Sequence, residues 1–236
     1  MVPEEKSFNP WGISVAIVLA GSVVAVSIYF TRLSDVSSGN QVVEREAHAE
    51  VASAVRQQGE LKQEAGEFVV GSETAPMTAY LFMDWQCAAC EEFYSQVLPE
   101  FSREFIDSGQ VKLVYKNFPL GEDSERSQLA AEAWQCAVGS DQAGEWGKRL
   151  LGSSADLNIE MLGRMAEDAG LDREQMENCL TEHEQLPVIG SGIQVAVATG
   201  ITEAPAIVIG DWLIEGSIQY EMLVDAVSSS LSEESI

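Results

Sequence analysis

The sequence predicts an α/β protein in which a block of helices interrupts an α/β unit, preceded by one N-terminal transmembrane helix. Three observations lead to this fold class. Short apolar runs typical of buried strands occur near both ends of the region from residue 67 onwards. Helical apolar patterns fill the middle of that region. An uncharged apolar run at residues 11–30 is long enough to cross a bilayer as a helix.

The composition fits a folded, acidic protein. The chain has 236 residues, of which 46% are hydrophobic, enough for the core of one or two domains. Its 38 acidic and 13 basic residues give a formal net charge of -25. This charge repels nucleic acid phosphates and anionic membrane surfaces, so it argues against nucleic acid binding. The simplest interpretation is a solvated acidic surface that keeps the protein soluble.

The N-terminal part divides into a tail, an anchor and a linker. Residues 1–10 form the tail, and residues 11–30 would span about 30 Å as a helix. Trp11 and Tyr29 stand near the ends of this helix, where aromatic rings favour the membrane interface. No small-residue cleavage pattern follows, so we expect an uncleaved anchor rather than a signal peptide. Residues 31–66 are polar and poor in aromatics, which indicates a spacer.

Residues 67–236 are predicted to form the globular domain. Apolar runs at residues 78–83 and 111–118 predict two buried strands. Between them, residues 87–108 carry a helical stripe, which Pro99 is expected to kink. The stripe residues recur at spacings of four: Phe93, Val97, Phe101 and Phe105. A strand, a helix and a second strand in this order imply a parallel right-handed crossover.

A helical insertion, about residues 122–200, follows the second strand. Five segments show helical patterns: 124–138, 146–151, 159–169, 172–180 and 186–199. The chain returns to strand at residues 206–216, where Gly210 and Asp211 predict a hairpin turn. A last helix is expected at residues 219–231. The insertion therefore lies within an α/β unit.

All four cysteines follow the predicted anchor, and an even number is typical of an oxidising compartment. A zinc site needs four ligands, whereas Cys87 and Cys90 form the one CxxC pair and His48 and His183 lie far apart. A purely structural bridge across two residues would remove little entropy from the unfolded chain. We therefore expect no metal and no cofactor. The CxxC pair is expected to have a role other than metal binding or stabilisation of the fold.

The position of the CxxC motif, DWQCAAC, predicts redox chemistry. It falls where a strand is expected to end and a helix to begin. The first sulfur then lies over unpaired helix N–H groups and the positive end of the helix dipole, which stabilise its thiolate. A substrate thiolate would attack Cys87, Cys90 would leave, and a second substrate thiol would resolve the mixed disulfide. Cys87 is the predicted exposed catalytic sulfur and Cys90 the buried resolving one.

At these residues the chain resembles the DsbA-like thiol-disulfide oxidoreductases of the thioredoxin superfamily. The resemblance runs from about residue 67 to residue 231. Five stretches carry it in the family's order: APMTAYLFMDWQCAACEEF, VKLVYKNFPL, SQLAAEAWQCA, AGLDREQMENCL and GITEAPAIVIGDWLIEGS. It implies a thioredoxin-like fold with an inserted helical domain. It also implies disulfide chemistry on secreted or cell-surface proteins, with reoxidation by a quinone-linked membrane partner when the role is oxidation.

The resemblance assigns substrate-binding positions beside the motif. Pro205 matches the proline that is cis in this superfamily and faces the CxxC pair, although the sequence alone would favour a trans bond. Ala204 replaces the Thr or Val that usually precedes this proline. We also expect Trp85 to line the substrate surface beside Cys87. Lys116, in the second strand, is expected to reach solvent.

Relatives with an insertion of this kind can carry a structural disulfide within it. Cys136 and Cys179 lie on separate predicted helices of the insertion. A bridge between them would stabilise the fold by about 4 kcal/mol if it acts by restricting the unfolded chain. The alternative is two buried free thiols that act as small hydrophobic side chains.

Other positions depart from the family pattern. Leu81 stands where the family often has a buried acid, and Asp84 is expected nearer the surface, where it caps or flanks the helix start. Between the cysteines, Ala88–Ala89 includes no histidine to donate to the thiolate, and Glu91–Glu92 opposes thiolate formation. We expect a lowered pKa for Cys87, but a less oxidising couple than a histidine-containing motif gives.

The sequence thus predicts a membrane-anchored thiol-disulfide oxidoreductase, with the domain outside the cytoplasm on a single-pass anchor in the cell membrane. Expected partners are cysteine-containing exported proteins and a membrane redox partner, either a quinone-linked oxidase or a reductase. We expect a monomer that binds no nucleic acid. One alternative is a disulfide isomerase or reductase, although residues 31–66 are too short and polar for an isomerase's dimerisation domain. Others are a non-enzymatic peptide-binding or chaperone module and a metal-delivery role.

Overall fold

The computed structural model describes residues 61–120, 124–153 and 157–233. The predicted anchor at residues 11–30 and most of the predicted linker lie outside these residues. Within the part of the chain that is described, no helix has both the length and the apolar character needed to cross a membrane.

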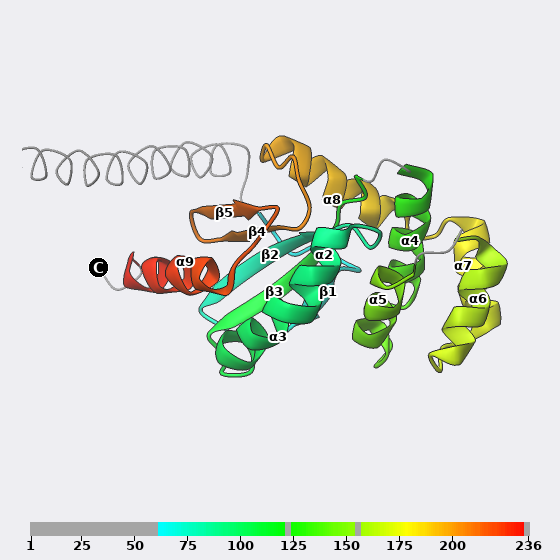
Figure 1. Ribbon diagram of the computed structural model, residues 1–236, viewed down its shortest axis with the longest axis horizontal. Helices are drawn as coiled ribbons and strands as arrows, with labels where there is room; N and C mark the ends of the chain where they lie inside the picture. Colours follow the sequence, from blue (N-terminus) through cyan, green and yellow to red (C-terminus); the bar gives the residue numbers. More distant parts are fainter. Residues whose placement is uncertain (1–60, 121–123, 154–156, 234–236) are drawn as a thin grey trace, which may run out of the picture. The chain divides into compact units, whose positions relative to one another are not determined.

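A five-stranded sheet forms the centre of the domain (Figure 1). The strands are β1 (Phe68–Val70), β2 (Met77–Met83), β3 (Val111–Asn117), β4 (Ala206–Ile209) and β5 (Trp212–Glu215). Their order is β1-β3-β2-β4-β5, in which β2 and β3 are parallel and the other neighbours are antiparallel. The sequence predicted all but β1, whose three residues are too few to show an apolar pattern.

The helical segment after β2 alternates between α-helical and π-helical hydrogen bonding. It consists of α2 (Ala88–Glu92), a π-helical turn (Phe93–Val97), α3 (Leu98–Phe101) and a second π-helical turn (Ser102–Ile106). The predicted apolar stripe has spacings of four residues, so in a regular α-helix of 3.6 residues per turn it would wind slowly around the helix. Wider π-helical turns, with i→i+5 hydrogen bonds, bring the stripe back to one face. The three phenylalanines of the stripe, Phe93, Phe101 and Phe105, are therefore all buried in the core. Pro99 lies in the first turn of α3, directly after the first π-helical turn.

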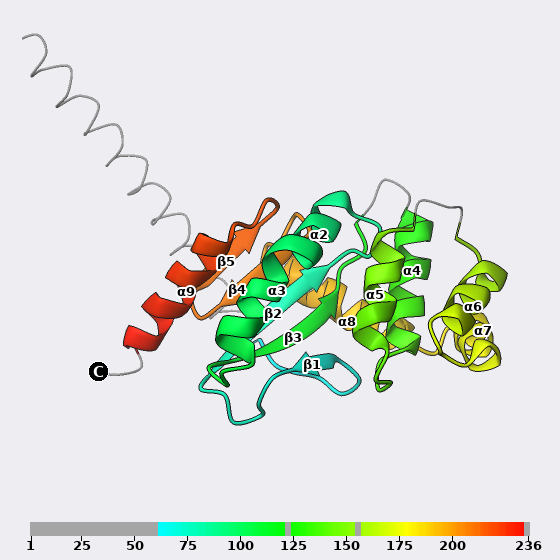
Figure 2. The same ribbon diagram turned by 60° about the horizontal axis from the view of Figure 1, so that its bottom comes forward.

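The helical insertion follows β3. Its helices are α4 (Ser124–Cys136), α5 (Ala143–Leu151), α6 (Ile159–Asp168), α7 (Arg173–Glu182) and α8 (Leu186–Ala198). After the β4–β5 hairpin the described chain ends with α9 (Tyr220–Glu233). Helices α4 to α7 gather to one side of the sheet (Figures 1 and 2). The α/β fold with a helical insertion, predicted from the sequence, is confirmed.

The sheet carries a separate apolar layer on each face. Helices α2, α3 and α9 cover one face, and α8 crosses the other (Figure 2). Side chains alternate along β2, so that Leu81 and Met83 join the first layer and Phe82 joins the second. Helix α8 approaches β3 closely because Gly192 has no side chain: a Cβ there would lie 2.5 Å from the Asn117 carbonyl oxygen.

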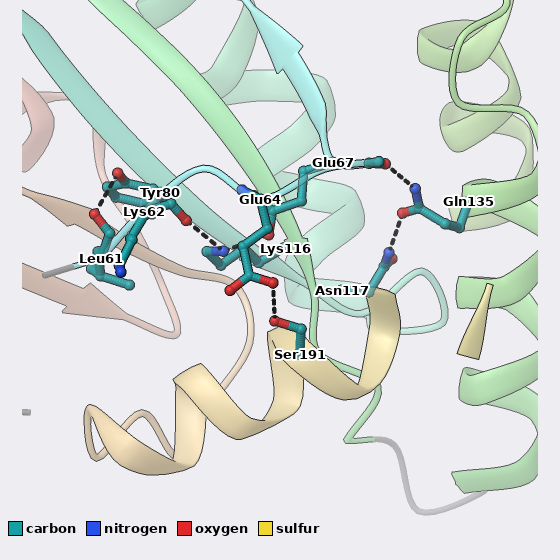
Figure 3. Close-up of polar contacts among 10 residues, drawn as sticks. Leu61, Lys62, Glu64, Glu67, Tyr80, Lys116, Asn117, Gln135 and Ser191 are labelled. Carbon is teal, nitrogen blue, oxygen red and sulfur yellow. Dashed lines mark hydrogen bonds and ion pairs between the residues drawn. The ribbon is translucent and has the colours of Figure 1, made fainter. Parts of the chain in front are cut away.

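Residues that precede β1 cover the α8 face of the sheet (Figure 3). Lys116 is buried there, so the expectation that it reaches solvent was wrong. Its ammonium pairs with the Glu67 carboxylate and donates to the Lys62 carbonyl oxygen at 3.2 Å. Nearby, the Tyr80 hydroxyl donates to the Leu61 carbonyl oxygen at 2.7 Å. A lysine can be buried in a strand when another segment supplies a counter-charge.

Candidate active site

The CxxC pair lies where β2 passes into α2. Cys87 is the N-cap of α2 and has an extended backbone, with φ −101° and ψ 127°. Its sulfur accepts the Cys90 backbone N–H at 3.1 Å. Both cysteines are free thiols; Cys87 is part-exposed, whereas Cys90 is fully buried one turn into the helix. The cap position therefore places one sulfur at the surface, over N–H groups that lack partners within the helix.

The two thiols differ in acidity. Hydrogen bonding from the Cys90 side chain is the largest cause that lowers the pKa of Cys87, from 9.0 to about 7. Burial and the charge of Asp84 oppose this change, and the backbone N–H groups of Cys90 and Ala89 assist it. Burial, followed by the interactions with Cys87, raises the pKa of Cys90. At neutral pH, Cys87 is therefore the nucleophile and Cys90 holds its proton.

The loop before β4 faces the exposed sulfur. The Ala204–Pro205 peptide bond is cis, and the Cys87 thiol donates to the Ala204 carbonyl oxygen at 3.3 Å. Pro205 is buried, whereas Ala204 is part-exposed. The structure thus brings together Cys87, Cys90 and the two loop residues named from the sequence. The contact uses the backbone of residue 204, so a larger side chain at this position is not needed for it.

Two residues that hold the loops beside Cys87 were missed by the sequence reasoning. The Glu215 carboxylate accepts the backbone N–H groups of Thr202 and Glu203 at 2.7 and 3.0 Å. The Gln86 side-chain amide donates to the Leu150 carbonyl oxygen in α5 at 2.9 Å. The register of the β4–β5 hairpin places Glu215 opposite the start of β4, and that register could have indicated its role. No pattern in the sequence around Gln86 indicates its role, because its hydrogen-bond partner lies in the insertion.

Trp85 does not line the substrate surface, because its side chain is fully buried. It stacks on Trp134 with ring centroids 4.4 Å apart, and its indole N–H donates to the Asn117 side-chain oxygen at 2.8 Å. Gly147 of α5 allows this packing, since a Cβ there would lie 2.6 Å from the Trp85 ring. The prediction failed because the insertion covers this side chain. Trp85 instead joins the insertion to the sheet.

Asp84 is buried, with 1% of its surface exposed, so its expected place near the surface was wrong. Its carboxylate accepts the backbone N–H groups of Gln86 and Leu120, each at 2.9 Å. It does not cap α2, because Cys87 occupies the cap position. The loop after β3 covers Asp84, and the local sequence could not show that contact. At Leu81 the core contains an apolar, fully buried side chain.

Comparison with known proteins decides the family. The sequence model of the family described as "Thioredoxin" matches residues 63–229. The chain belongs to the thioredoxin family. Disulfide bond formation protein D of Bacillus subtilis (strain 168) is 25% identical over 174 residues, which cover 70% of this chain and 78% of that protein.

Two crystal structures show the same fold as this thioredoxin-family chain. Oxidised BdbD from Bacillus subtilis has a TM-score of 0.63 at 22% identity, covering 71% of this chain and 94% of BdbD. DsbA from Chlamydia trachomatis has a TM-score of 0.62 at 23% identity, covering 75% and 98% of the two chains. These two similarities show the shared fold. The family match and the similarity to disulfide bond formation protein D confirm the enzyme class expected from the sequence, a DsbA-like thiol-disulfide oxidoreductase.

A disulfide links two helices of the insertion in this thioredoxin-family domain. Cys136 at the end of α4 and Cys179 in α7 are bonded, with 6.1 Å between their Cα atoms. That separation is usual for a disulfide. Within the described ranges of the chain, no group of three or more His, Cys, Asp or Glu side chains could hold a metal ion.

Proposed function

We propose that this protein exchanges disulfides with cysteine-containing exported proteins through Cys87 and Cys90. The contrast between the two sulfurs carries the proposal. Cys87 is part-exposed with its pKa lowered to about 7, whereas Cys90 is buried with its pKa raised. Reversible exchange needs a reactive sulfur at the surface and a protected partner within reach.

In the oxidising direction, a substrate thiolate attacks the sulfur of Cys87 in the Cys87–Cys90 disulfide. The Cys90 sulfur leaves and takes a proton, which its raised pKa favours. A second substrate thiolate then attacks the substrate sulfur of the mixed disulfide, and Cys87 leaves as a thiolate hydrogen-bonded by the Cys90 N–H. Two electrons pass from the substrate to the enzyme, and the reverse sequence reduces a substrate disulfide.

The loop at Ala204 and Pro205 is the proposed substrate-binding edge. Its carbonyl group at Ala204 lies 3.3 Å from the Cys87 sulfur, so a polypeptide along this loop would bring a cysteine within reach of the pair. The Glu215 carboxylate holds the loop through two backbone N–H groups. A loop that is fixed before substrate arrives orients the attacking sulfur at a smaller entropic cost.

We further propose that the domain lies outside the cytoplasm on an N-terminal anchor. The uncharged run at residues 11–30 and the position of all four cysteines after it support this topology. A membrane redox partner, either a quinone-linked oxidase or a reductase, would reset the pair. Protease added to intact spheroplasts should digest residues 67–236, and full protection of that region would contradict the topology.

A trapping experiment tests the function directly. In the full-length chain, Cys90→Ser should retain mixed disulfides on Cys87, because the resolving sulfur is absent. Mass spectrometry should identify exported cysteine-containing proteins in these adducts. The double variant Cys87→Ser/Cys90→Ser is the matched control and should trap none. Equal recovery of the same proteins from both variants would contradict thiol exchange and favour non-covalent binding.

Thiol alkylation in cells gives the direction of electron flow. A Cys87–Cys90 pair held as a disulfide indicates an oxidase, whereas a pair held as free thiols indicates an isomerase or reductase. Either state is compatible with the same exchange steps, because each step is reversible.

A further inference from the structure

We propose that Asp84 is a positioning residue for disulfide exchange: its buried carboxylate fixes the loop that leads into Cys87 and makes the pair less oxidising than the helix end alone would make it. The inference rests on the proposed function and concerns the redox equilibrium of the same site.

The geometry shows how Asp84 holds the site. One carboxylate oxygen accepts the Gln86 backbone N–H and the other accepts the Leu120 backbone N–H, both at 2.9 Å. The Asp84 carbonyl oxygen also accepts the Cys87 backbone N–H at 3.3 Å. One residue therefore joins the segment before α2 to the loop after β3. The entry of the chain into α2, and with it the position of the Cys87 sulfur, depends on these contacts.

The charge of Asp84 acts on both sulfurs. It raises the pKa of Cys87 against the hydrogen bonds that lower it. At Cys90 the charge also raises the pKa, but the backbone hydrogen bond of Asp84 lowers it there. Asp84 is 1% exposed, so mobile ions screen its field poorly. Glu91 follows Cys90 directly but is exposed to solvent, where dissolved salt screens a carboxylate.

Glutathione makes the energetic consequence measurable. The enzyme disulfide and two glutathione thiols give the enzyme dithiol and one glutathione disulfide, and two electrons pass to the enzyme. Near pH 7 the dithiol form carries a partly ionised Cys87, whereas the disulfide form carries no sulfur charge. A fixed anion beside the pair therefore destabilises the reduced form selectively, and removal of that anion should favour reduction.

Asp84→Asn in the full-length chain removes the charge and keeps one acceptor oxygen. The thiolate absorbance of Cys87 should then appear at lower pH. The equilibrium constant for reduction by glutathione should rise about threefold, which is about 14 mV for a two-electron couple. Glu91→Gln is the matched control, and its smaller shift should vanish in about 0.5 M salt while the Asp84→Asn shift persists. A folded Asp84→Asn with unchanged values, or with a shift that salt abolishes, would overturn the inference.

A measurement on the unaltered chain covers the case in which Asp84→Asn does not fold. Electrostatic coupling between two sites is reciprocal, so ionisation of Cys87 must perturb Asp84. With 13C-labelled aspartate, the Asp84 carboxyl resonance should shift with a midpoint near pH 7 in the reduced protein, and this step should be missing from the oxidised protein. The same titration in both redox states would refute the coupling.

The outcome for Asp84 can be separated from the outcome for the proposed function. If Cys90→Ser traps substrates while Asp84 shows no coupling to Cys87, the inference about Asp84 fails and disulfide exchange stands. If Cys90→Ser traps nothing, disulfide exchange itself fails, whatever Asp84 does.

Discussion

Cys87 and Cys90 are identical side chains that one turn of helix makes unequal. The Cys87 sulfur caps the helix and accepts an N–H group, whereas the Cys90 sulfur lies in the core without contact with solvent. Their pKa values move in opposite directions as a result. The division of labour between attacking and resolving sulfur therefore follows from burial and hydrogen bonding at single residues.

This difference predicts the pH dependence of alkylation. In the reduced protein, the rate of reaction with iodoacetamide should rise through a midpoint near pH 7 and should modify Cys87, because the thiolate is the nucleophile. Cys90→Ala removes the largest cause of the low pKa, so its midpoint should move to higher pH. Stopped-flow alkylation with peptide mapping measures both effects. A midpoint near 9.0 in the unaltered chain would contradict the assignment.

The buried pair of Lys116 and Glu67 predicts an asymmetric response to substitution. Lys116→Met leaves the Glu67 carboxylate, whose side chain is 2% exposed, without its counter-charge. This change should lower the free energy of unfolding by about 3–5 kcal/mol. The double variant Lys116→Met/Glu67→Leu should recover much of that loss, because no unpaired charge remains buried. Urea denaturation of the oxidised proteins compares them, and equal losses in both variants would argue against this origin of stability.

Among single residues, the local sequence predicted those whose chemistry depends on their own segment. The CxxC motif at a strand-to-helix junction indicated Cys87 and Cys90. The burial of Asp84, Trp85 and Lys116 depends on segments far along the chain: the loop after β3, the insertion and the residues before β1. No periodicity within a segment contains that information, and all three side chains were placed wrongly.

At the scale of elements, the packing of α8 on β3 depends on a missing side chain. Gly192→Ala would place a Cβ 2.5 Å from the Asn117 carbonyl oxygen, so helix or strand must shift. We expect a loss of about 1–3 kcal/mol in the free energy of unfolding. Gly190→Ala in the same helix is the matched control, because a Cβ there meets no atom within 4 Å. It should be neutral or stabilise by up to about 1 kcal/mol, and equal losses in urea melts of both variants would refute the packing argument.

The Cys136–Cys179 bridge predicts a stability effect that is separate from activity. It joins positions 43 residues apart, and closing such a loop restricts the unfolded chain by about 4 kcal/mol. Cys136→Ala/Cys179→Ala should therefore unfold at lower urea concentration, with a loss of about 2–4 kcal/mol. The comparison keeps Cys87–Cys90 oxidised in both proteins. Unchanged stability, or loss of thiol exchange in a folded variant, would contradict a structural role.

The elements themselves were largely predictable, and the exceptions have physical causes. Helices and strands with strong apolar periodicity appeared close to their expected bounds. β1 was missed because three part-buried residues show no pattern, and it exists because it pairs with β3. The π-helical turns accompany stripe spacings of four, but the same spacings also fit a plain helix, so the sequence did not distinguish the two.

For the whole molecule, the sheet brings the functional residues to one place. The carboxyl end of β2 leads into Cys87, and antiparallel β4 begins beside it, so Ala204 and Pro205 meet the sulfur from a segment far along the chain. The insertion adds α5 behind the motif, where the Gln86 amide and the buried Trp85 attach it. The order of elements predicted an α/β unit interrupted by helices, and the resemblance to DsbA-like proteins implied that its sheet is thioredoxin-like.

In the proposed exchange, Cys87 receives the substrate sulfur and Cys90 resolves the mixed disulfide. The most direct test uses the purified reduced full-length chain and a peptide whose single cysteine carries a 2-pyridyl disulfide. The cysteine thiolate of the protein attacks the sulfur of the peptide cysteine and releases pyridine-2-thione, whose absorbance gives the rate. We predict that Cys90→Ser forms a stable adduct rapidly at pH 7, whereas Cys87→Ser reacts far more slowly because Cys90 is buried with a raised pKa. Equal rates in the two variants would contradict these roles of Cys87 and Cys90.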